Sequence, residues 1–264
     1  MSDWLHNLPV VWMALVVFSV TFLFAILIQT AVAMLAIGER MRAFKAVSPG
    51  MLSPLGVIFG LFVAFTAAQV WNDNDRANAA VNREASALKS VLVLAATFPG
   101  DSEEHLRSLV RRYVEETANQ EWPMMVRHTA TLSISPASLV EALQQTLALS
   151  PNNSGQQIAQ REIVTSLENA FEARRQRILA SRSRVDFTKW ACLILQAACA
   201  LLAIAVVHSD NRLASTISLG VFATGIAASV LLILVHDEPF VGQVSVGAQP
   251  LLQIMPDFAL KAHQ

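Results

Sequence analysis

Acidic and histidine side chains that could bind a metal are grouped at two places in the sequence. His236, Asp237 and Glu238 are adjacent, and Asp73 and Asp75 are two residues apart. Carboxylate and imidazole groups at such spacing suit calcium or a transition metal. Each group, however, comes directly after a long apolar run, where polar residues ordinarily mark the end of a membrane helix. We therefore predict no metal site and no cofactor.

Residue patterns that typically carry catalysis are missing from the sequence. It has no glycine-rich phosphate loop, no Gly-x-Ser-x-Gly turn, no His-Glu-x-x-His pair and no cysteines at zinc spacing. Cys192 and Cys199 lie two turns apart in one apolar stretch, where a helix cannot bring them together as a disulfide. We predict that the protein is not an enzyme.

Five arginines precede the third apolar run: Arg174, Arg175, Arg177, Arg182 and Arg184. Guanidinium groups on a helix that enters a membrane attract anions or hold lipid phosphates, and membrane lipid is therefore a predicted partner. No aromatic residues alternate with these arginines, and the formal net charge is −1, so nucleic acid is not a predicted partner.

The apolar composition predicts that most of this chain lies in a membrane. Hydrophobic residues make up 54% of the 264 residues, charged residues only 15%, and the mean hydropathy is +0.46. Four runs are long enough to cross a hydrocarbon layer of roughly 30 Å. They cover about residues 10–37, 52–71, 187–207 and 213–235. The first lacks a positive n-region and a cleavage site, so we interpret it as an uncleaved anchor.

The order of the runs predicts an all-α membrane protein in four parts. Residues 1–71 form a transmembrane hairpin, 72–186 a helical extramembrane domain, 187–235 a second hairpin and 236–264 a C-terminal tail. In this tail, a turn with proline and glycine followed by alternating Val244 and Val246 and then Pro250 suggests a short extended segment folded back on the domain. An even number of spans places the domain, the N-terminus and the tail on one side of the membrane.

Apolar residues at helical spacing predict four helical segments in the domain. The first continues the second span to residue 98, and the second starts at Asp101 and stops at Trp122-Pro123. A third lies between Ser135-Pro136 and the turn at 150–155, and the fourth runs from about Gln156 into the third span.

The distribution of Lys and Arg near the spans favours a cytoplasmic domain. The domain side carries Arg76, Arg83, Arg174, Arg175, Arg177, Arg182, Arg184 and Lys189, and the opposite side carries Arg40, Arg42, Lys45 and Arg212. The short loop 38–53 is itself basic, which weakens this asymmetry.

The second span carries two stripes of different character. Gly56, Gly60, Ala64 and Ala68 recur every four residues, a pattern that allows close helix packing in lipid. Two residues further on, about 200° around a helix, lie Ile58, Phe62 and Thr66. Phe62 most simply faces lipid or another helix. The alternative is that this second stripe lines an apolar pore neck that closes by dewetting.

Several segments together resemble bacterial membrane proteins with a bestrophin-like domain, a family largely of unknown function. The resemblance rests on the second span with its glycines and Trp71, on Val81-Asn82-Arg83-Glu84-Ala85-x-x-Leu88, on Glu121-Trp122-Pro123, on the arginine run, and on Asp237-x-Pro239-Phe240-x-Gly242 with Pro250-Leu251. It implies the bacterial cytoplasmic (inner) membrane as location.

A more distant resemblance links the second span to the neck helix of bestrophin anion channels. Gly60-Leu61-Phe62-Val63 leading to Trp71-Asn72 carries this likeness. It implies a homo-oligomer, a pentamer by resemblance only, with inorganic ions as partners and with Ile58 and Phe62 facing the pore. The acidic calcium clasp of bestrophins has no convincing counterpart here.

Two functions from different classes are consistent with these observations. The leading hypothesis is a homo-oligomeric ion channel, and the alternative is a non-conducting oligomeric scaffold or stress-signalling protein that acts through its helical domain. A transporter is disfavoured because the spans lack buried ionisable residues and internal inverted repeats, although Gln29, Gln69 and Gln196 could form a polar path.

Overall fold

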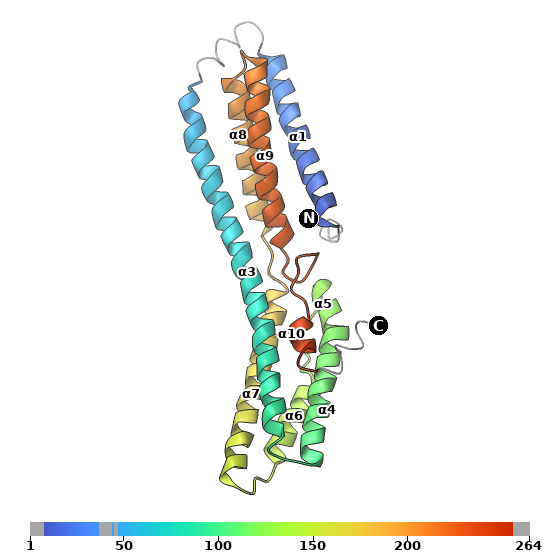
Figure 1. Ribbon diagram of the computed structural model, residues 1–264. Coiled ribbons are helices and arrows are strands. Elements are labelled where there is room, and N and C mark those ends of the chain that lie inside the picture. The colour runs from blue at the N-terminus through green and yellow to red at the C-terminus, as the bar shows by residue number, and fades with distance from the viewer. Residues whose placement is uncertain (1–7, 37–43, 45–46, 256–264) are drawn as a thin grey trace. The chain divides into compact units, whose positions relative to one another are not determined.

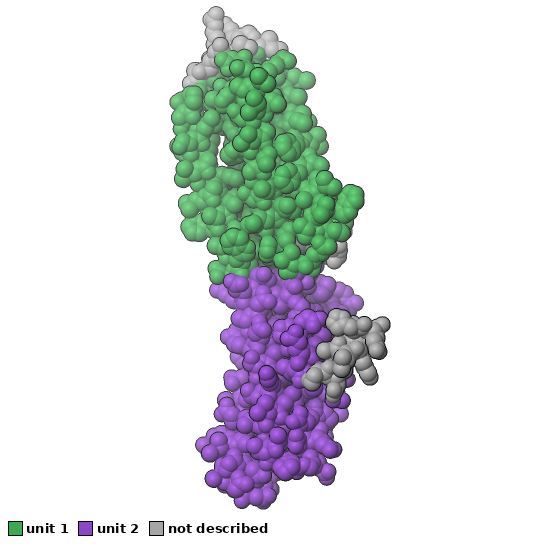
Figure 2. All heavy atoms as spheres, viewed as in Figure 1, with its two compact units in different colours: residues 1–72, 184–238, 242–244 green, residues 73–183, 239–241, 245–264 purple. Residues whose placement is uncertain are grey.

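The computed structural model describes residues 8–36, 44 and 47–255 (Figure 1). Within these ranges the chain is helical and contains no strand. It divides into two compact units, shown in different colours in Figure 2. Unit 1 comprises residues 1–72, 184–238 and 242–244, and unit 2 comprises residues 73–183, 239–241 and 245–264. The predicted basic residues Arg40, Arg42 and Lys45 lie outside the described residues.

Four helices in the described residues are long and apolar enough to cross a membrane, as predicted. They are α1 (Val10–Leu35), α3 (Leu52–Ala95), α8 (Phe187–Val207) and α9 (Arg212–His236). A short 3-10 turn, Pro49–Met51, precedes α3. The 21 residues of α8 rise by about 32 Å at 1.5 Å per residue, which is enough for the hydrocarbon layer.

In unit 1, α1, α8 and α9 pack against one another around an apolar core that includes Leu193, Ala223 and Ile233. The part of α3 that belongs to this unit, residues 52–72, contacts α9 through Phe59 and Phe222, whose ring centroids are 5.8 Å apart. An apolar cavity of about 400 Å³ lies between α3, α8 and α9. The contact of α3 with its own chain is therefore incomplete.

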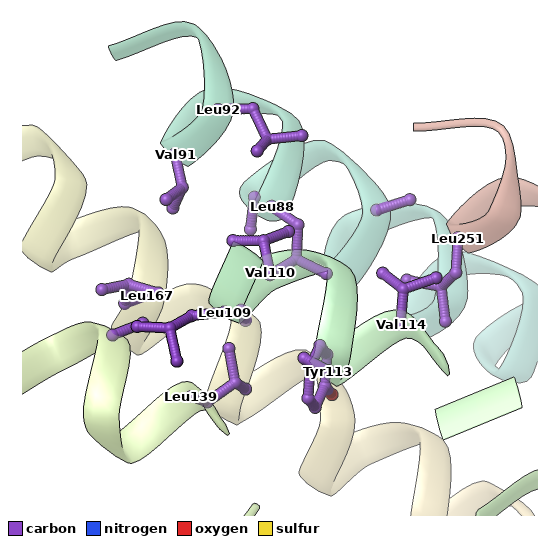
Figure 3. Packing of buried hydrophobic residues seen from close by; sticks show 14 of the residues in the cluster. Leu88, Val91, Leu92, Leu109, Val110, Tyr113, Val114, Leu139, Leu167 and Leu251 are labelled. Atoms are coloured by element: carbon purple, nitrogen blue, oxygen red, sulfur yellow. The ribbon is translucent and has the colours of Figure 1, made fainter. Parts of the chain in front are cut away.

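Unit 2 contains residues 73–95 of α3 and several shorter helices. These are α4 (Asp101–Glu116), a π-helical turn (Thr117–Glu121), α5 (Trp122–Val126), α6 (Ala137–Ala148), α7 (Ser154–Ala180) and α10 (Gln249–Leu252). Figure 3 shows part of the core that they form, which includes Leu88, Leu109, Leu139, Leu167 and Leu251. Each of these five side chains is fully buried, which stabilises the unit by the hydrophobic effect.

Local signals in the sequence set the ends of the helices in unit 2. Gly100, at φ 95°, turns the chain between α3 and α4, and three acidic residues, Asp101, Glu103 and Glu104, occupy the first turn of α4. The side chain of Asn153 accepts a hydrogen bond from the backbone N–H of Gln156 at 2.9 Å and caps α7.

Two predicted helix boundaries in the domain are wrong. The second segment does not stop at Trp122-Pro123, because a π-helical turn leads directly into α5 and Pro123 occupies its first turn, where a missing N–H costs no hydrogen bond. The fourth segment does not run into the third span, because α7 ends at Ala180 and α8 starts at Phe187. No glycine or proline marks that break in the sequence.

The C-terminal segment was predicted to fold back on the helical domain, and its described part packs into the core of unit 2. Phe240, Val246, Leu251 and Met255 are buried there. The segment is not extended throughout, since residues 249–252 form the helical turn α10.

Candidate functional site

The exposed face of α3 in unit 1 is the first candidate for function. Side chains on one side of the helix, at Phe59, Thr66 and Val70, are buried in the unit. On the other side Val57, Ile58, Leu61, Phe65 and Trp71 are exposed. A membrane helix with an exposed face of this width contacts lipid, another protein chain or a pore.

The predicted small-residue stripe lies largely on this exposed face. Gly60, Ala64 and Ala68 are exposed, and Gly56 is half-buried. Apart from the neighbouring backbone of α3 itself, no atom of the described residues lies within 4 Å of the position that a Cβ would take on Gly56 or Gly60. Gly56 lines the cavity between α3, α8 and α9, whereas Gly60, Ala64 and Ala68 are exposed, so the close approach that these three permit is not used by the described residues of unit 1.

The predicted neck residues do not share one exposed face. Ile58 is 54% exposed, Phe62 is half-buried against the core of unit 1, and Thr66 is 5% exposed. The hydroxyl of Thr66 donates to the carbonyl oxygen of Phe62 at 2.9 Å. Residues four apart advance by about 40° beyond one full turn, so two such steps carry the stripe from the exposed side into the core.

The three glutamines of the spans are dispersed rather than joined in a path. Gln29 donates from Nε2 to Thr216 Oγ1 at 2.7 Å, and Lys189 Nζ donates to the side-chain oxygen of Gln69. The side-chain oxygen of Gln196 is buried and has no hydrogen-bond partner among the residues that the structure describes.

A buried network of charges in unit 2 is the second candidate. At its centre is Arg177 on α7, whose side chain is 0% exposed. Its Nε and Nη2 atoms donate to the two carboxylate oxygens of Glu84, on α3, at 2.7 and 3.0 Å. Nη2 also donates to Glu121 Oε2 at 2.6 Å, and the guanidinium carbon lies 5.1 Å from the ring centroid of Trp122. The parallel pair of bonds to Glu84 is the strong bidentate form of this interaction.

A second arginine and a tyrosine complete the network. Arg174, one turn before Arg177, donates from Nε and Nη2 to Glu121 Oε1 at 3.0 and 2.6 Å. The hydroxyl of Tyr113, on α4, donates to Glu84 Oε1. Two arginines thus face two glutamates, and the network carries no net formal charge.

Burial and charge shift the pKa values of two of these groups. Burial alone would lower the pKa of Arg177, but the negative charge of Glu84 and its hydrogen bonds outweigh that effect and raise the pKa. The pKa of Tyr113 is raised well above its ordinary value, first by burial and then by the negative charge of Glu84. Both groups therefore hold their protons throughout the physiological range.

The π-helical turn and the C-terminal segment position one end of the network. A π-helical turn adds a residue to the helical repeat, and here it ends at Glu121, which bonds both arginines. The next residue, Trp122, covers Arg177 and is met edge-on by Phe240, with ring centroids 5.6 Å apart and an interplanar angle of 76°.

The five arginines predicted to bind anions or lipid phosphate separate into two groups. Arg174 and Arg177 are buried and paired with carboxylates, so their guanidinium groups do not face solvent or lipid. Arg175, Arg182 and Arg184 are exposed. Arg175 pairs with Glu172 at 3.3 Å, and Arg182 donates to the carbonyl oxygen of Ala130 at 2.6 Å. Phosphate binding stays a prediction for these three.

The acidic residues that begin the C-terminal segment have structural contacts. Asp237 Oδ1 accepts a hydrogen bond from the backbone N–H of Val185 at 2.6 Å, two residues before α8 begins. Asp237 and Glu238 are both buried. Asp73 accepts a hydrogen bond from Ser183 at 2.7 Å and pairs with Arg76 at 3.5 Å. No group of three potential metal ligands occurs in the described part of the chain.

The fold and these features define a helical membrane protein with four candidate spans. Residues 19–251 match the family model of the bestrophin-like domain. The chain therefore belongs to the family of proteins with a bestrophin-like domain. A search of curated proteins gives no match.

Solved structures with a similar fold include two mutants of a bacterial bestrophin homologue from Klebsiella pneumoniae. One is 10% identical, with a TM-score of 0.72 over 92% of this chain and 99% of its own. The other is 14% identical, with a TM-score of 0.68 over 95% and 99%. A crystal structure described as a membrane protein is also 14% identical, with a TM-score of 0.67 over 95% and 98%. At such identities the likeness establishes the fold.

Proposed function

We propose that this protein is a homo-oligomeric ion channel of the bestrophin type, with a narrow apolar neck on α3. The observation that carries the proposal is the exposed face of α3 in unit 1, where bulky apolar side chains are more than half exposed and the described residues leave space beside Gly56 and Gly60. Family membership and the fold of the Klebsiella pneumoniae homologue support the same reading.

The exposure of the side chains on α3, rather than the predicted stripe alone, supports the position proposed for the neck. Of the predicted residues, Ile58 is freely exposed, Phe62 is at the edge of the core and Thr66 is inside it. Val57 and Leu61, at 66% and 55% exposure, lie on the exposed face beside Ile58. Rings of these side chains from several subunits would form a constriction that excludes water when closed. The small residues on the same face would allow the subunits to approach closely.

The proposal also covers the location of the protein, the role of its helical domain and its partners. The channel lies in the bacterial cytoplasmic membrane, the helical domain of residues 72–186 extends into the cytoplasm as a vestibule, and inorganic ions pass along the axis. Membrane lipid surrounds the other spans. The subunit number is to be counted by single-particle imaging of detergent-purified protein.

Reconstituted protein in vesicles tests the neck through a pair of adjacent substitutions. Leu61→Ala removes an exposed side chain and is expected to increase ion flux, because the constriction widens. Phe62→Ala removes a half-buried side chain and is expected to lower thermal stability with a smaller change in flux. Equal flux from Leu61→Ala and the unsubstituted protein would refute a neck at this position.

A non-conducting scaffold is the second candidate, and the same exposed face favours it. Small residues on a membrane helix are sufficient for assembly without a pore. The two functions separate in the imaging experiment: a symmetry axis lined by α3 supports the channel, and an axis filled by other helices supports the scaffold.

A further inference from the structure

An open apolar groove lies between α1, α8 and α9 in unit 1. Its volume is about 330 Å³. The floor consists of almost fully buried side chains, among them Leu193, Leu201 and Leu234. The rims carry exposed side chains, such as Val20 on α1 at 60% exposure and Ile194 on α8 at 55%. Among the described residues, none of α3 lines the groove, so it is separate from the proposed neck.

The groove has the length and the position of one leaflet of a bilayer. On α8 its lining extends from Trp190, the fourth residue of the helix, to Leu201, which corresponds to a rise of about 16 Å at 1.5 Å per residue. Half of a hydrocarbon layer of roughly 30 Å is about 15 Å. Tryptophan is common where a span meets the lipid head groups. The groove therefore starts near one membrane surface and ends near the middle of the hydrocarbon layer.

The lining of the groove suits a hydrocarbon ligand. Thr21 is the one hydroxyl side chain of the lining, and it donates to the carbonyl oxygen of Val17 at 2.8 Å. Apart from the indole of Trp190, the other lining side chains are purely hydrocarbon. An unfilled groove loses dispersion contacts along its floor. A chain that fills it is therefore stabilised by packing, even though the surrounding lipid is equally apolar.

The size of the groove selects an acyl chain over a helix of another protein chain. A helix with its side chains is about 10–12 Å across, so a stretch of about 12 Å would occupy on the order of 1,000 Å³. This is about three times the volume of the groove. A single hydrocarbon chain is narrow enough to lie along the floor between the two rims.

Positive charge lies at the end of the groove that meets the membrane surface. Arg184 is exposed and precedes the first residue of α8 by three positions. Lys189, in the first turn of α8, adds a second positive charge, and its ammonium group donates to the side-chain oxygen of Gln69. A guanidinium group at a membrane surface attracts anionic lipid head groups and bonds well to phosphate.

We propose that this groove binds one acyl chain of an anionic phospholipid, whose phosphate group is held by Arg184. The chain packs between α1 and the hairpin of α8 and α9, and it fills the space that these helices leave open within one leaflet. The site depends on the spans being in a membrane. It does not depend on whether the protein conducts ions.

Native mass spectrometry tests the site on protein purified in a neutral detergent and titrated with dioleoylphosphatidylglycerol. One lipid per chain is expected to bind about fivefold more tightly than dioleoylphosphatidylcholine, because one arginine near the surface attracts the net negative charge. Arg184→Gln is expected to remove this preference. Ile194→Trp overfills the groove and is expected to weaken lipid binding by about tenfold. Val20→Trp repeats this test from the opposite rim, and circular dichroism checks that both variants keep their helical content.

Two matched controls separate the groove from general effects of bulk and charge. Leu195 is adjacent to Ile194 and 64% exposed but does not line the groove, so Leu195→Trp should bind the lipid like the unsubstituted protein. Arg175→Gln removes an exposed arginine of unit 2 and should keep the preference for phosphatidylglycerol. The proposal is overturned if the tryptophans at 194 and 195 have equal effects, or if the two lipids bind equally well. It is also overturned if inorganic phosphate displaces phosphatidylglycerol, because the head group alone would then account for binding.

Discussion

Replacing Arg177 by methionine is the most direct test of the buried network. The substitution removes the guanidinium group and keeps a side chain of similar length and apolar volume. Two carboxylates would then lose a partner: Glu84, which is fully buried, loses both of its bonds to Arg177, and Glu121 keeps only Arg174. The hydroxyl of Tyr113 would be the one donor left to Glu84 in the network.

The magnitude follows from the burial of the pair. Removing one partner of a buried ion pair typically costs about 3–5 kcal/mol, because a charge stays in a low-dielectric environment without compensation. For a chain of this size, each kcal/mol lowers the melting temperature by about 2–4 °C. We therefore expect Arg177→Met to lower the melting temperature by about 6–20 °C.

Arg175→Met is the matched control. Arg175 lies on the same helix, is exposed and pairs with Glu172 at the protein surface, where solvent screens the two charges and the pair contributes little to stability. Thermal unfolding in detergent, followed by circular dichroism, compares the two variants. If Arg177→Met and Arg175→Met lower the melting temperature equally, the buried network does not stabilise unit 2 and the reasoning fails.

Other predictions concern a titration, the core of unit 2 and assembly. Tyr113 is the single tyrosine of the sequence, so tyrosinate absorbance near 295 nm reports on it alone. Because the pKa of Tyr113 is raised in the fold, the folded protein should show no tyrosine ionisation near pH 10, whereas protein unfolded in guanidinium should ionise at about pH 10. The contribution of Tyr113 to stability is therefore complete below the pKa of the unfolded chain and is lost as the pH rises through the pKa of the folded protein. Ionisation of the folded protein at the ordinary pKa would contradict the burial of this side chain. Phe240→Ala, which removes the ring packed on Trp122, should cost about 3–5 kcal/mol in a denaturant melt, and the exposed Phe187→Ala should cost under about 1 kcal/mol. Gly60→Leu should shift purified protein toward smaller oligomers in light scattering without unfolding it, and an unchanged mass would argue against assembly through this face.

The membrane helices could be predicted from the sequence because their signal is long and uniform. An apolar run such as 187–207 needs no knowledge of its neighbours to be identified, and it matches α8 to the residue. The break between α7 and α8 could not be predicted in this way. Residues 181–186 contain no glycine or proline, and one contact that holds this segment comes from Asp237, more than fifty residues further along the chain.

The faces of α3 were harder to predict than its length. A stripe drawn at every fourth residue looks straight in a sequence, but on a helix of 3.6 residues per turn it turns steadily around the axis. Ile58 and Thr66 therefore belong to different environments although they share one predicted stripe. The position of the core, which depends on how α8 and α9 pack, decides which residues of α3 remain exposed.

The sequence contains one indication of the buried network, and it lies at Glu84 rather than in the run of arginines. Glu84 occupies a helical repeat otherwise filled by apolar residues, with Ala77, Val81 and Leu88 on the same face. A carboxylate in that position is stable only if a cation reaches it from another element, since an unpaired buried charge is costly. Two of the five arginines therefore had a predictable partner inside the protein. Arg174 and Arg177, three residues apart on one helix face, are the pair that Glu84 and Glu121 together neutralise.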